Sequence, residues 1–188
     1  MALLIAGLVL FFGIHLVPAI PALRARWVGV WGEERYRRTF AVVAAVGLLL
    51  IVAGYIIAPR GAQLFTGSSA AKSIAPFAMV LSFVLLASAN MKTHVRARIR
   101  HPMLLGIIIW STVHLLANGD ARGTVLFGSF LAFSVVDLAS AVSRGAVKPF
   151  VPAHKYDVMA VVGGIVAAFV VMLLHRVFFG VPAVWWSL

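Results

Sequence analysis

The histidines within apolar stretches are the residues of this sequence best suited to chemistry. His114 lies inside the run RHPMLLGIIIWSTVHLLANGD, and His15 and His175 are also flanked by apolar residues. An ionisable side chain at membrane depth is costly, so it usually faces other helices and has a specific partner. For His114 we expect a metal centre, a carboxylate or a bound ligand. Three such histidines in one small bundle favour a shared site over separate hydrogen bonds between helices.

Helix geometry limits which histidines can bind one metal ion. His101 and His114 are 13 residues apart in one apolar stretch, which is roughly 20 Å of rise and about 220° of rotation on a helix. They cannot bind the same ion, so a second ligand must come from another helix. Gly106, Trp110 and His114 are spaced by four and share one face. This face suits a planar cofactor, and it suits plain helix packing equally well.

The other candidate residues have two interpretations each. His94 and His154 lie in basic loops, where we expect solvated surface side chains. His101 directly precedes Pro102, so it is either a competing metal ligand or a residue at the start of a helix, where it caps the helix or meets lipid headgroups. Asp137 is the only carboxylate well inside an apolar stretch, and burial requires a partner for it. It either orients an imidazole that binds a metal or pairs with a loop arginine such as Arg144.

Composition predicts the environment of these residues. The chain has 188 residues, of which 63% are hydrophobic and only 11% charged, and its mean hydropathy is +1.05. A water-soluble domain cannot cover so much apolar surface, so we expect a single domain over 1–188 that contacts the lipid bilayer. The chain has no cysteine, which excludes disulfides, thiolate-ligated haem and iron–sulfur clusters. Histidine is therefore the expected metal ligand.

The apolar stretches predict an all-α, polytopic transmembrane bundle. A helix needs roughly 20 apolar residues to cross the hydrocarbon core, and we count six spans, with five as the alternative count. The third is the weakest, because Pro76 lies in its first turn and polar residues dilute it. The predicted spans are Leu3–Ile20, Thr39–Ile57, Ile74–Asn90, Pro102–Asn118, Thr124–Val142 and Asp157–Phe178.

The net charge of +11 predicts orientation in the membrane. Arginines and lysines concentrate between spans one and two, three and four, and five and six. Because such residues gather in cytoplasmic loops, both termini are expected on the periplasmic side. The basic loops explain the charge without nucleic-acid binding. The first span is expected to be retained, since no lysine or arginine precedes Arg24 as a signal peptide would require.

Motifs along nearly the whole chain resemble those of the NnrU family of bacterial membrane proteins, which is homologous to the zeta-carotene isomerases of plants and cyanobacteria. The block from Arg100-His101-Pro102 to His114 is the most specific part. The matching residues are His15 with Pro21-Ala22-Leu23-Arg24, Gly32-Glu33-Glu34-Arg35 with Tyr36-Arg37, Arg100-His101-Pro102 with Gly106, Trp110, His114 and Asn118-Gly119, and His175 with Phe179-Gly180.

The resemblance implies a haem-b protein of the bacterial inner membrane with a role in denitrification and nitrogen-oxide metabolism. The positions that hold iron in the isomerases match His15 and His114, and neutral imidazoles suit axial ligation. Arg24 and Arg35 fall on matched positions and suit the haem propionates, although topology explains them too. Any enzymatic activity would be a haem-dependent cis–trans isomerisation of a hydrophobic polyene. Catalytic residues, substrate and oligomeric state stay unassigned.

Two alternatives remain open at the level of the sequence. The predicted topology places His15 nearer the cytoplasmic face and His114 nearer the outer face, so His175 competes with His15 as the second ligand. The chain also lacks the extra amino-terminal membrane region of the isomerases, which weakens carotenoid chemistry more than haem binding. A cofactor-free membrane assembly or interaction factor for nitrite and nitric oxide respiration is the alternative function. The haem protein would admit a hydrophobic or gaseous ligand.

Overall fold

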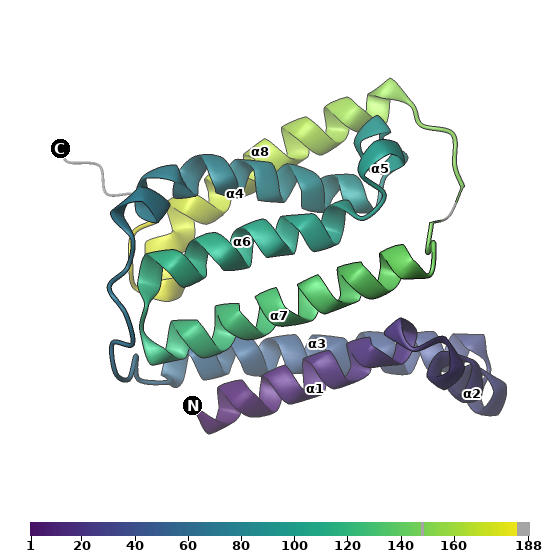
Figure 1. Ribbon diagram of the computed structural model, residues 1–188, viewed down its shortest axis with the longest axis horizontal. Helices are drawn as coiled ribbons and strands as arrows, with labels where there is room; N and C mark the ends of the chain where they lie inside the picture. Colours follow the sequence, from purple (N-terminus) through teal and green to yellow (C-terminus); the bar gives the residue numbers. More distant parts are fainter. Residues whose placement is uncertain (148, 184–188) are drawn as a thin grey trace. The chain divides into compact units, whose positions relative to one another are not determined.

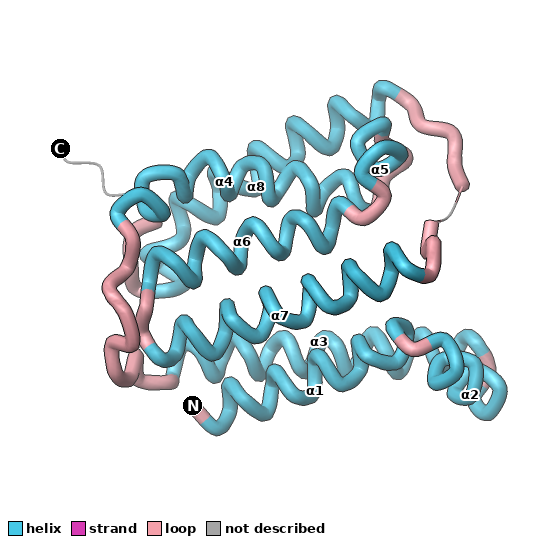
Figure 2. Tube along the Cα trace, viewed as in Figure 1, coloured by secondary structure: helices cyan, strands magenta, loops and turns pink. Residues whose placement is uncertain are grey.

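A computed structural model describes residues 1–147 and 149–183. The described residues form helices joined by loops, with no strand and a single isolated bridge between Gln63 and Asp120 (Figure 2). The prediction of an all-α, polytopic helical bundle is confirmed. The helices are α1 (Ala2–Ala19), α2 (Pro21–Trp31), α3 (Glu33–Ile57), α4 (Ser69–Ala89), α5 (His94–Ile99), α6 (Pro102–Asn118), α7 (Ala121–Ser143) and α8 (His154–Phe179) (Figure 1).

Five of these helices are long and apolar enough to cross a membrane, namely α1, α3, α4, α7 and α8. The sixth, α6, is equally apolar in character but has 17 residues. At 1.5 Å per residue it is about 26 Å long, slightly less than the hydrocarbon thickness. All six predicted spans are therefore helical. The short helices α2 and α5 lie in the stretches that the sequence assigned to loops.

The third span differs from its prediction at its beginning. Helix α4 begins at Ser69, five residues before the predicted start, so Pro76 lies inside the helix and not in its first turn. The side chain of Ser68 accepts a hydrogen bond from the Ala71 amide at 3.2 Å and caps the helix. The first turns of α4 are small and polar, and hydropathy alone does not detect them.

The chain forms two compact units. The first contains 1–63 and 120–129, and the second contains 64–119 and 130–188. Helix α7 belongs to both, because its residues up to Ser129 are in the first unit and those from Phe130 are in the second. The single domain expected over 1–188 stays a prediction, and each unit is described by itself.

In the first unit, α1 packs closely against α3. A Cβ added to Gly7 would lie 2.6 Å from the Ile51 amide nitrogen, and one added to Gly47 would lie 2.9 Å from that of Phe11. Positions near the start of α1 thus meet the end of α3 and the reverse, so the two helices are antiparallel. Small residues allow such close backbone approach, which is how helices associate in lipid.

In the second unit, α4 packs against both α6 and α8. The side chain of Ser82 is fully buried and donates a hydrogen bond of 2.8 Å to the Gly106 carbonyl oxygen on α6. On the α8 side, a Cβ added to Gly164 would lie 2.6 Å from Val84 Cα. These contacts fix the rotation of α6 and α8 about their own axes. They therefore decide which side chains of those helices meet each other.

Candidate functional site: the histidines of the membrane helices

His114 lies partly buried in α6, one turn before the helix ends. Its Nδ1 atom is 2.8 Å from the carbonyl oxygen of Trp110. Because a carbonyl only accepts, Nδ1 carries the proton, and in the neutral ring the lone pair is on Nε2. A hydrogen bond at one imidazole nitrogen that leaves the lone pair on the other is the usual arrangement of a metal-binding histidine. The protonation of His114 therefore fits an axial ligand.

His175 on α8 is the histidine that the second unit brings to His114. The centroids of the two rings are 6.5 Å apart, and the ring planes differ by 28°. The Nδ1 atom of His175 donates to the Val181 carbonyl oxygen at 2.7 Å, so its lone pair is also on Nε2. Phe179 packs beside it, with ring centroids 4.8 Å apart. Two imidazoles with the same tautomer thus lie close to each other in the second unit, between helices that are apolar enough to be membrane-embedded.

Aromatic rings surround the His114–His175 pair. The Trp110 ring lies 5.4 Å from that of His114 and meets Phe130 edge to face at the same distance. Gly106, one turn further back on α6, lies against α4, where an added Cβ would be 2.9 Å from the Ser82 carbonyl oxygen. The glycine thus serves helix packing, which is one of the two interpretations of its spacing. Cofactor contact by Gly106 and Trp110 stays a prediction.

His15 lies in the first unit, on α1. Its Nδ1 atom donates to the Phe11 carbonyl oxygen at 2.7 Å, so its tautomer is the same as in His114 and His175. Its ring packs on Phe11, with centroids 4.1 Å apart, and on Phe40 of α3 at 5.0 Å. Since His15 and His114 belong to different units, the pairing of the two through one iron stays a prediction.

The two arginines expected at propionates lie near the start of α3. Arg24 on α2 is exposed, and its Nη2 atom donates to both carboxylate oxygens of Glu33, at 2.8 and 3.0 Å. Its guanidinium also lies over the Tyr36 ring, 5.6 Å from the centroid. A haem propionate would have to displace the Glu33 carboxylate from the Arg24 guanidinium. Arg35 is exposed in the first turn of α3.

His101 is the N-cap residue directly before α6, which agrees with its expected position at the start of a helix. Its side chain forms no capping hydrogen bond. The preceding residue, Arg100, has φ of 68° and ψ of −47°, and the His101 amide donates to the Ile99 carbonyl oxygen at 2.8 Å. This is a classic γ-turn, a strained conformation for a residue with a side chain. The turn connects α5 to α6.

Asp137 is partly buried in the part of α7 that belongs to the second unit. None of the ion pairs within 1–147 and 149–183 involves it. Arg144, the loop partner expected for it, directly follows α7 and donates to the hydroxyl of Ser140 in the last turn of that helix. The role of Asp137 in orienting an imidazole stays a prediction.

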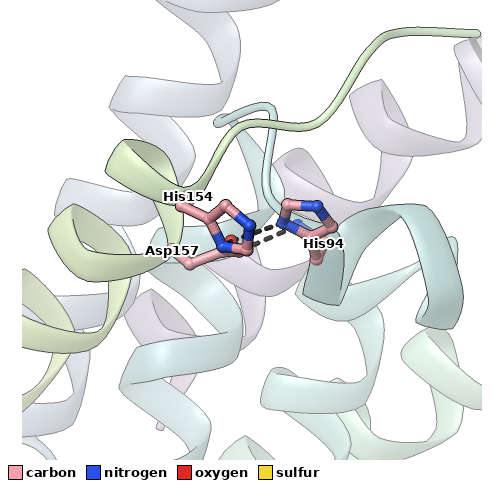
Figure 3. A group of neighbouring side chains, drawn as sticks. All are labelled: His94, His154 and Asp157. Atoms are coloured by element: carbon pink, nitrogen blue, oxygen red, sulfur yellow. Dashed lines mark hydrogen bonds and ion pairs between the residues drawn. The ribbon is translucent and has the colours of Figure 1, made fainter.

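One cluster of side chains was missed by sequence reasoning, which assigned His94 and His154 to the solvated surface. The carboxylate of Asp157, in the first turn of α8, lies close to both imidazoles (Figure 3). Its Oδ2 atom is 2.6 Å from His94 Nδ1 and 3.9 Å from His154 Nδ1. The only local signal is the spacing of His154 and Asp157 by three, because His94 is 63 residues from Asp157.

Comparison with known proteins gives one match. No curated protein and no solved structure matches the sequence significantly. The model of the NnrU protein family matches residues 3–183, which include all three histidines of the membrane helices. Since the match covers nearly the whole chain, this chain belongs to the NnrU family.

Proposed function

We propose that this NnrU family member is a haem-b protein of the bacterial inner membrane with a role in denitrification and nitrogen-oxide metabolism. His114 would be one of the residues that hold the iron. The resemblance to the isomerases supports His15 as the second ligand. The short distance between the His114 and His175 rings supports the competing pair.

The observation that carries this proposal is the shared protonation of the three histidines. Each of them donates from Nδ1 to a backbone carbonyl oxygen, at 2.7 to 2.8 Å. This leaves Nε2 as the nitrogen with the lone pair in every ring, which is the state that binds a metal. The absence of cysteine from the sequence agrees with imidazole as the ligand type.

Haem supplies an iron centre whose redox state and ligation control what else can bind. The residues around His114 and His175 would provide an apolar surrounding that excludes water, through Trp110, Phe130 and Phe179. Such a surrounding suits a hydrophobic or gaseous ligand. If the chain is an enzyme, the resemblance supports a haem-dependent cis–trans isomerisation of a polyene.

The orientation in the membrane follows the distribution of cationic residues. Basic residues concentrate in the stretches 21–38, 92–100 and 144–155, which all connect predicted spans on one side. We infer that this side is cytoplasmic, so that both termini are periplasmic. Fusion of a periplasm-specific reporter to the amino terminus tests the inference, and activity of a cytoplasm-specific reporter there would contradict it.

An absorption spectrum of the protein purified in detergent from haem-replete cells tests haem binding. We expect a Soret band and, after dithionite reduction, the sharp alpha band of a b-type haem. His114→Ala should lose both, and the exposed His154→Ala should keep both. A colourless wild-type preparation, or unchanged bands in His114→Ala, would overturn the proposal.

A cofactor-free membrane assembly factor for nitrite and nitric oxide respiration is the second candidate. The same hydrogen bonds favour it, because a histidine that donates to the carbonyl of its own helix can be purely structural. A colourless wild-type protein whose His114→Ala variant unfolds at a lower temperature would support this candidate.

A further inference from the structure

We propose that His94, His154 and Asp157 form a second, non-haem metal site for a divalent transition ion of the Zn²⁺ type. One ligand atom from each of the three side chains lies within 4.8 Å of the other two. The site uses none of the residues assigned to haem, so it stands independently of the proposed function. Imidazole and carboxylate are ligands that Zn²⁺ prefers, whereas Mg²⁺ prefers oxygen alone.

The second unit assembles this site from two distant stretches of chain. The backbone amide of Ala153 donates to the Lys92 carbonyl oxygen at 3.0 Å, which ties the segment before α8 to the turn before α5. Asp157 then accepts from the His94 amide at 2.8 Å through Oδ1. These two bonds place the His94 and Asp157 side chains together, whatever the state of the imidazoles.

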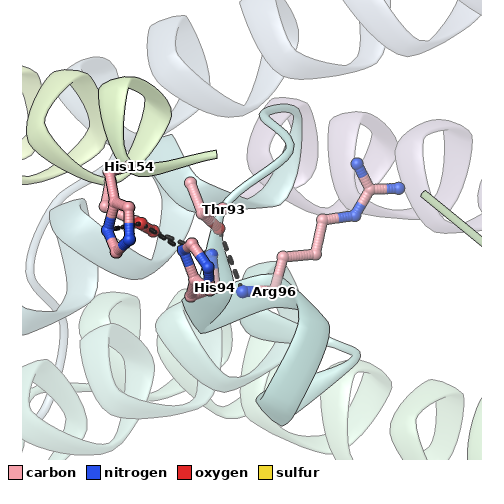
Figure 4. A network of polar contacts seen from close by, with 5 residues as sticks. Thr93, His94, Arg96 and His154 are labelled. Carbon is pink, nitrogen blue, oxygen red and sulfur yellow. Dashed lines mark hydrogen bonds and ion pairs between the residues drawn. The ribbon is translucent and has the colours of Figure 1, made fainter. Parts of the chain in front are cut away.

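Thr93 anchors the His94 side of the site (Figure 4). Its side chain is fully buried and accepts a hydrogen bond of 3.0 Å from the Arg96 amide, so it caps α5. His94 follows it directly and is partly exposed. The backbone that carries His94 is therefore held by both Thr93 and Asp157, and only its ring has to adjust.

His154 completes the site from the exposed side. Its side chain is 94% exposed, yet its ring stacks on that of His94, with centroids 4.6 Å apart and planes 27° apart. Stacking holds the two Nδ1 atoms on the same side, toward the Asp157 carboxylate. Solvent reaches the cluster beside His154, which leaves room for water as a further metal ligand.

The distances allow a tetrahedral ion after small movements. Two ligands at about 2.0 to 2.1 Å from a tetrahedral Zn²⁺ are roughly 3.3 Å apart. The Asp157 oxygen is 2.6 Å from one Nδ1 and 3.9 Å from the other. The first of these separations must lengthen and the second shorten, each by less than about 1 Å, and the two imidazole nitrogens, which lie within 4.8 Å of each other, must also come to about 3.3 Å. Rotation of the exposed His154 ring and a small shift of His94 supply these changes.

Metal binding here replaces a proton. Without the ion, His94 Nδ1 donates a hydrogen bond to the Asp157 carboxylate. When Zn²⁺ binds Nδ1, this proton leaves that nitrogen and the neutral ring carries its proton on Nε2 instead, so the Nδ1 lone pair binds the ion. Basic side chains that flank the site repel the positive charge of the ion. Two of them are held by cation–π contacts with aromatic rings. Arg96 lies over Phe150 at 4.8 Å, and Lys155 lies over Tyr156 at 5.1 Å.

Calorimetric titration of the EDTA-stripped, full-length protein in detergent with ZnCl₂ tests the site. We expect one Zn²⁺ equivalent whose affinity falls by at least about tenfold in His154→Ala, while MgCl₂ gives no heat of binding. Because His154 is exposed, this variant should fold normally. His101→Ala is the matched control and should bind Zn²⁺ as the wild type does. Any Zn²⁺ bound by the membrane histidines would persist in His154→Ala and is thereby distinguished.

Thermal unfolding gives a second measurement. A ligand that binds only the folded state raises the melting temperature, so Zn²⁺ should stabilise the wild type and His101→Ala but not His154→Ala. No Zn²⁺ binding by the wild type, or equal binding by His154→Ala, would overturn the proposal. The haem spectrum of His154→Ala should equal that of the wild type, since the two sites share no residue.

Discussion

The imidazole rings of His114 and His175 lie 6.5 Å apart, and each donates from Nδ1 to a backbone carbonyl oxygen. They come from α6 and α8, two helices that do not follow each other in the sequence but both pack against α4, through Ser82 and Val84 respectively. This relationship gives His114 a potential co-ligand within its own unit. It makes the identity of the second axial ligand an experimental question.

The first prediction concerns that second ligand. If His15 completes the coordination, His15→Ala should convert a six-coordinate, low-spin haem to a five-coordinate, high-spin one, because one imidazole is lost while His114 remains. His175→Ala should then keep the low-spin spectrum. Ultraviolet–visible and electron paramagnetic resonance spectra of the oxidised variants distinguish the spin states. A high-spin His175→Ala with a low-spin His15→Ala would assign the second ligand to His175.

The second prediction concerns the contact between α4 and α8. A Cβ on residue 164 would lie 2.6 Å from Val84 Cα, so Gly164→Ala should lower the free energy of unfolding by about 1–3 kcal/mol. The neighbouring Gly163 has nothing within 4 Å of an added Cβ. Gly163→Ala should therefore be neutral or stabilise by up to about 1 kcal/mol, since alanine favours helix. Unfolding in mixed detergent micelles measures both, and equal effects would contradict this packing.

The third prediction concerns Arg122 of α7, whose side chain caps the C-terminus of α3 within the first unit. Its Nη1 atom donates to the carbonyl oxygens of Tyr55 and Ala58 at 2.8 and 2.9 Å, and its guanidinium lies 4.2 Å from the Tyr55 ring centroid. Arg122→Ala leaves these two carbonyls without their charged donor and should cost about 1.5–3 kcal/mol. Thermal unfolding should show the loss, whereas the exposed Arg60→Ala should change little. Similar melting temperatures for both variants would refute the capping role.

The fourth prediction concerns the γ-turn before α6. Arg100 is the only residue other than glycine with positive φ among those the structure describes. Since glycine adopts this conformation without steric cost, Arg100→Gly should raise the free energy of unfolding by about 1 kcal/mol. Arg98→Gly, within α5, should lower it by about 1 kcal/mol instead. Chemical denaturation of both variants provides the measurement, and a destabilised Arg100→Gly would argue against strain at this turn.

Several elements could be predicted from the sequence because their signals are local. The six apolar stretches became helices, and the predicted span at 102–118 coincides with α6, since Pro102 at its first position and Gly119 after its last are strong boundary signals. The beginning of α4 was missed, because its cap at Ser68 and its polar first turns contribute nothing to hydropathy. Likewise α2 and α5 are too polar to be counted as spans.

The residues of the candidate site also divide into those that the sequence predicted and those that only the structure brought together. The sequence by itself determined that this is a polytopic membrane protein of the NnrU family. It also singled out the histidines flanked by apolar residues as the expected metal ligands. Both results rest on composition and motif spacing, which are properties of the chain alone. Only the tertiary structure brought His175 to His114, and His94 to Asp157 across 63 residues. Such pairs depend on the rotation of packed helices, which is set by close contacts such as those of Gly106 and Gly164. No local pattern encodes that rotation, so the structure had to decide it.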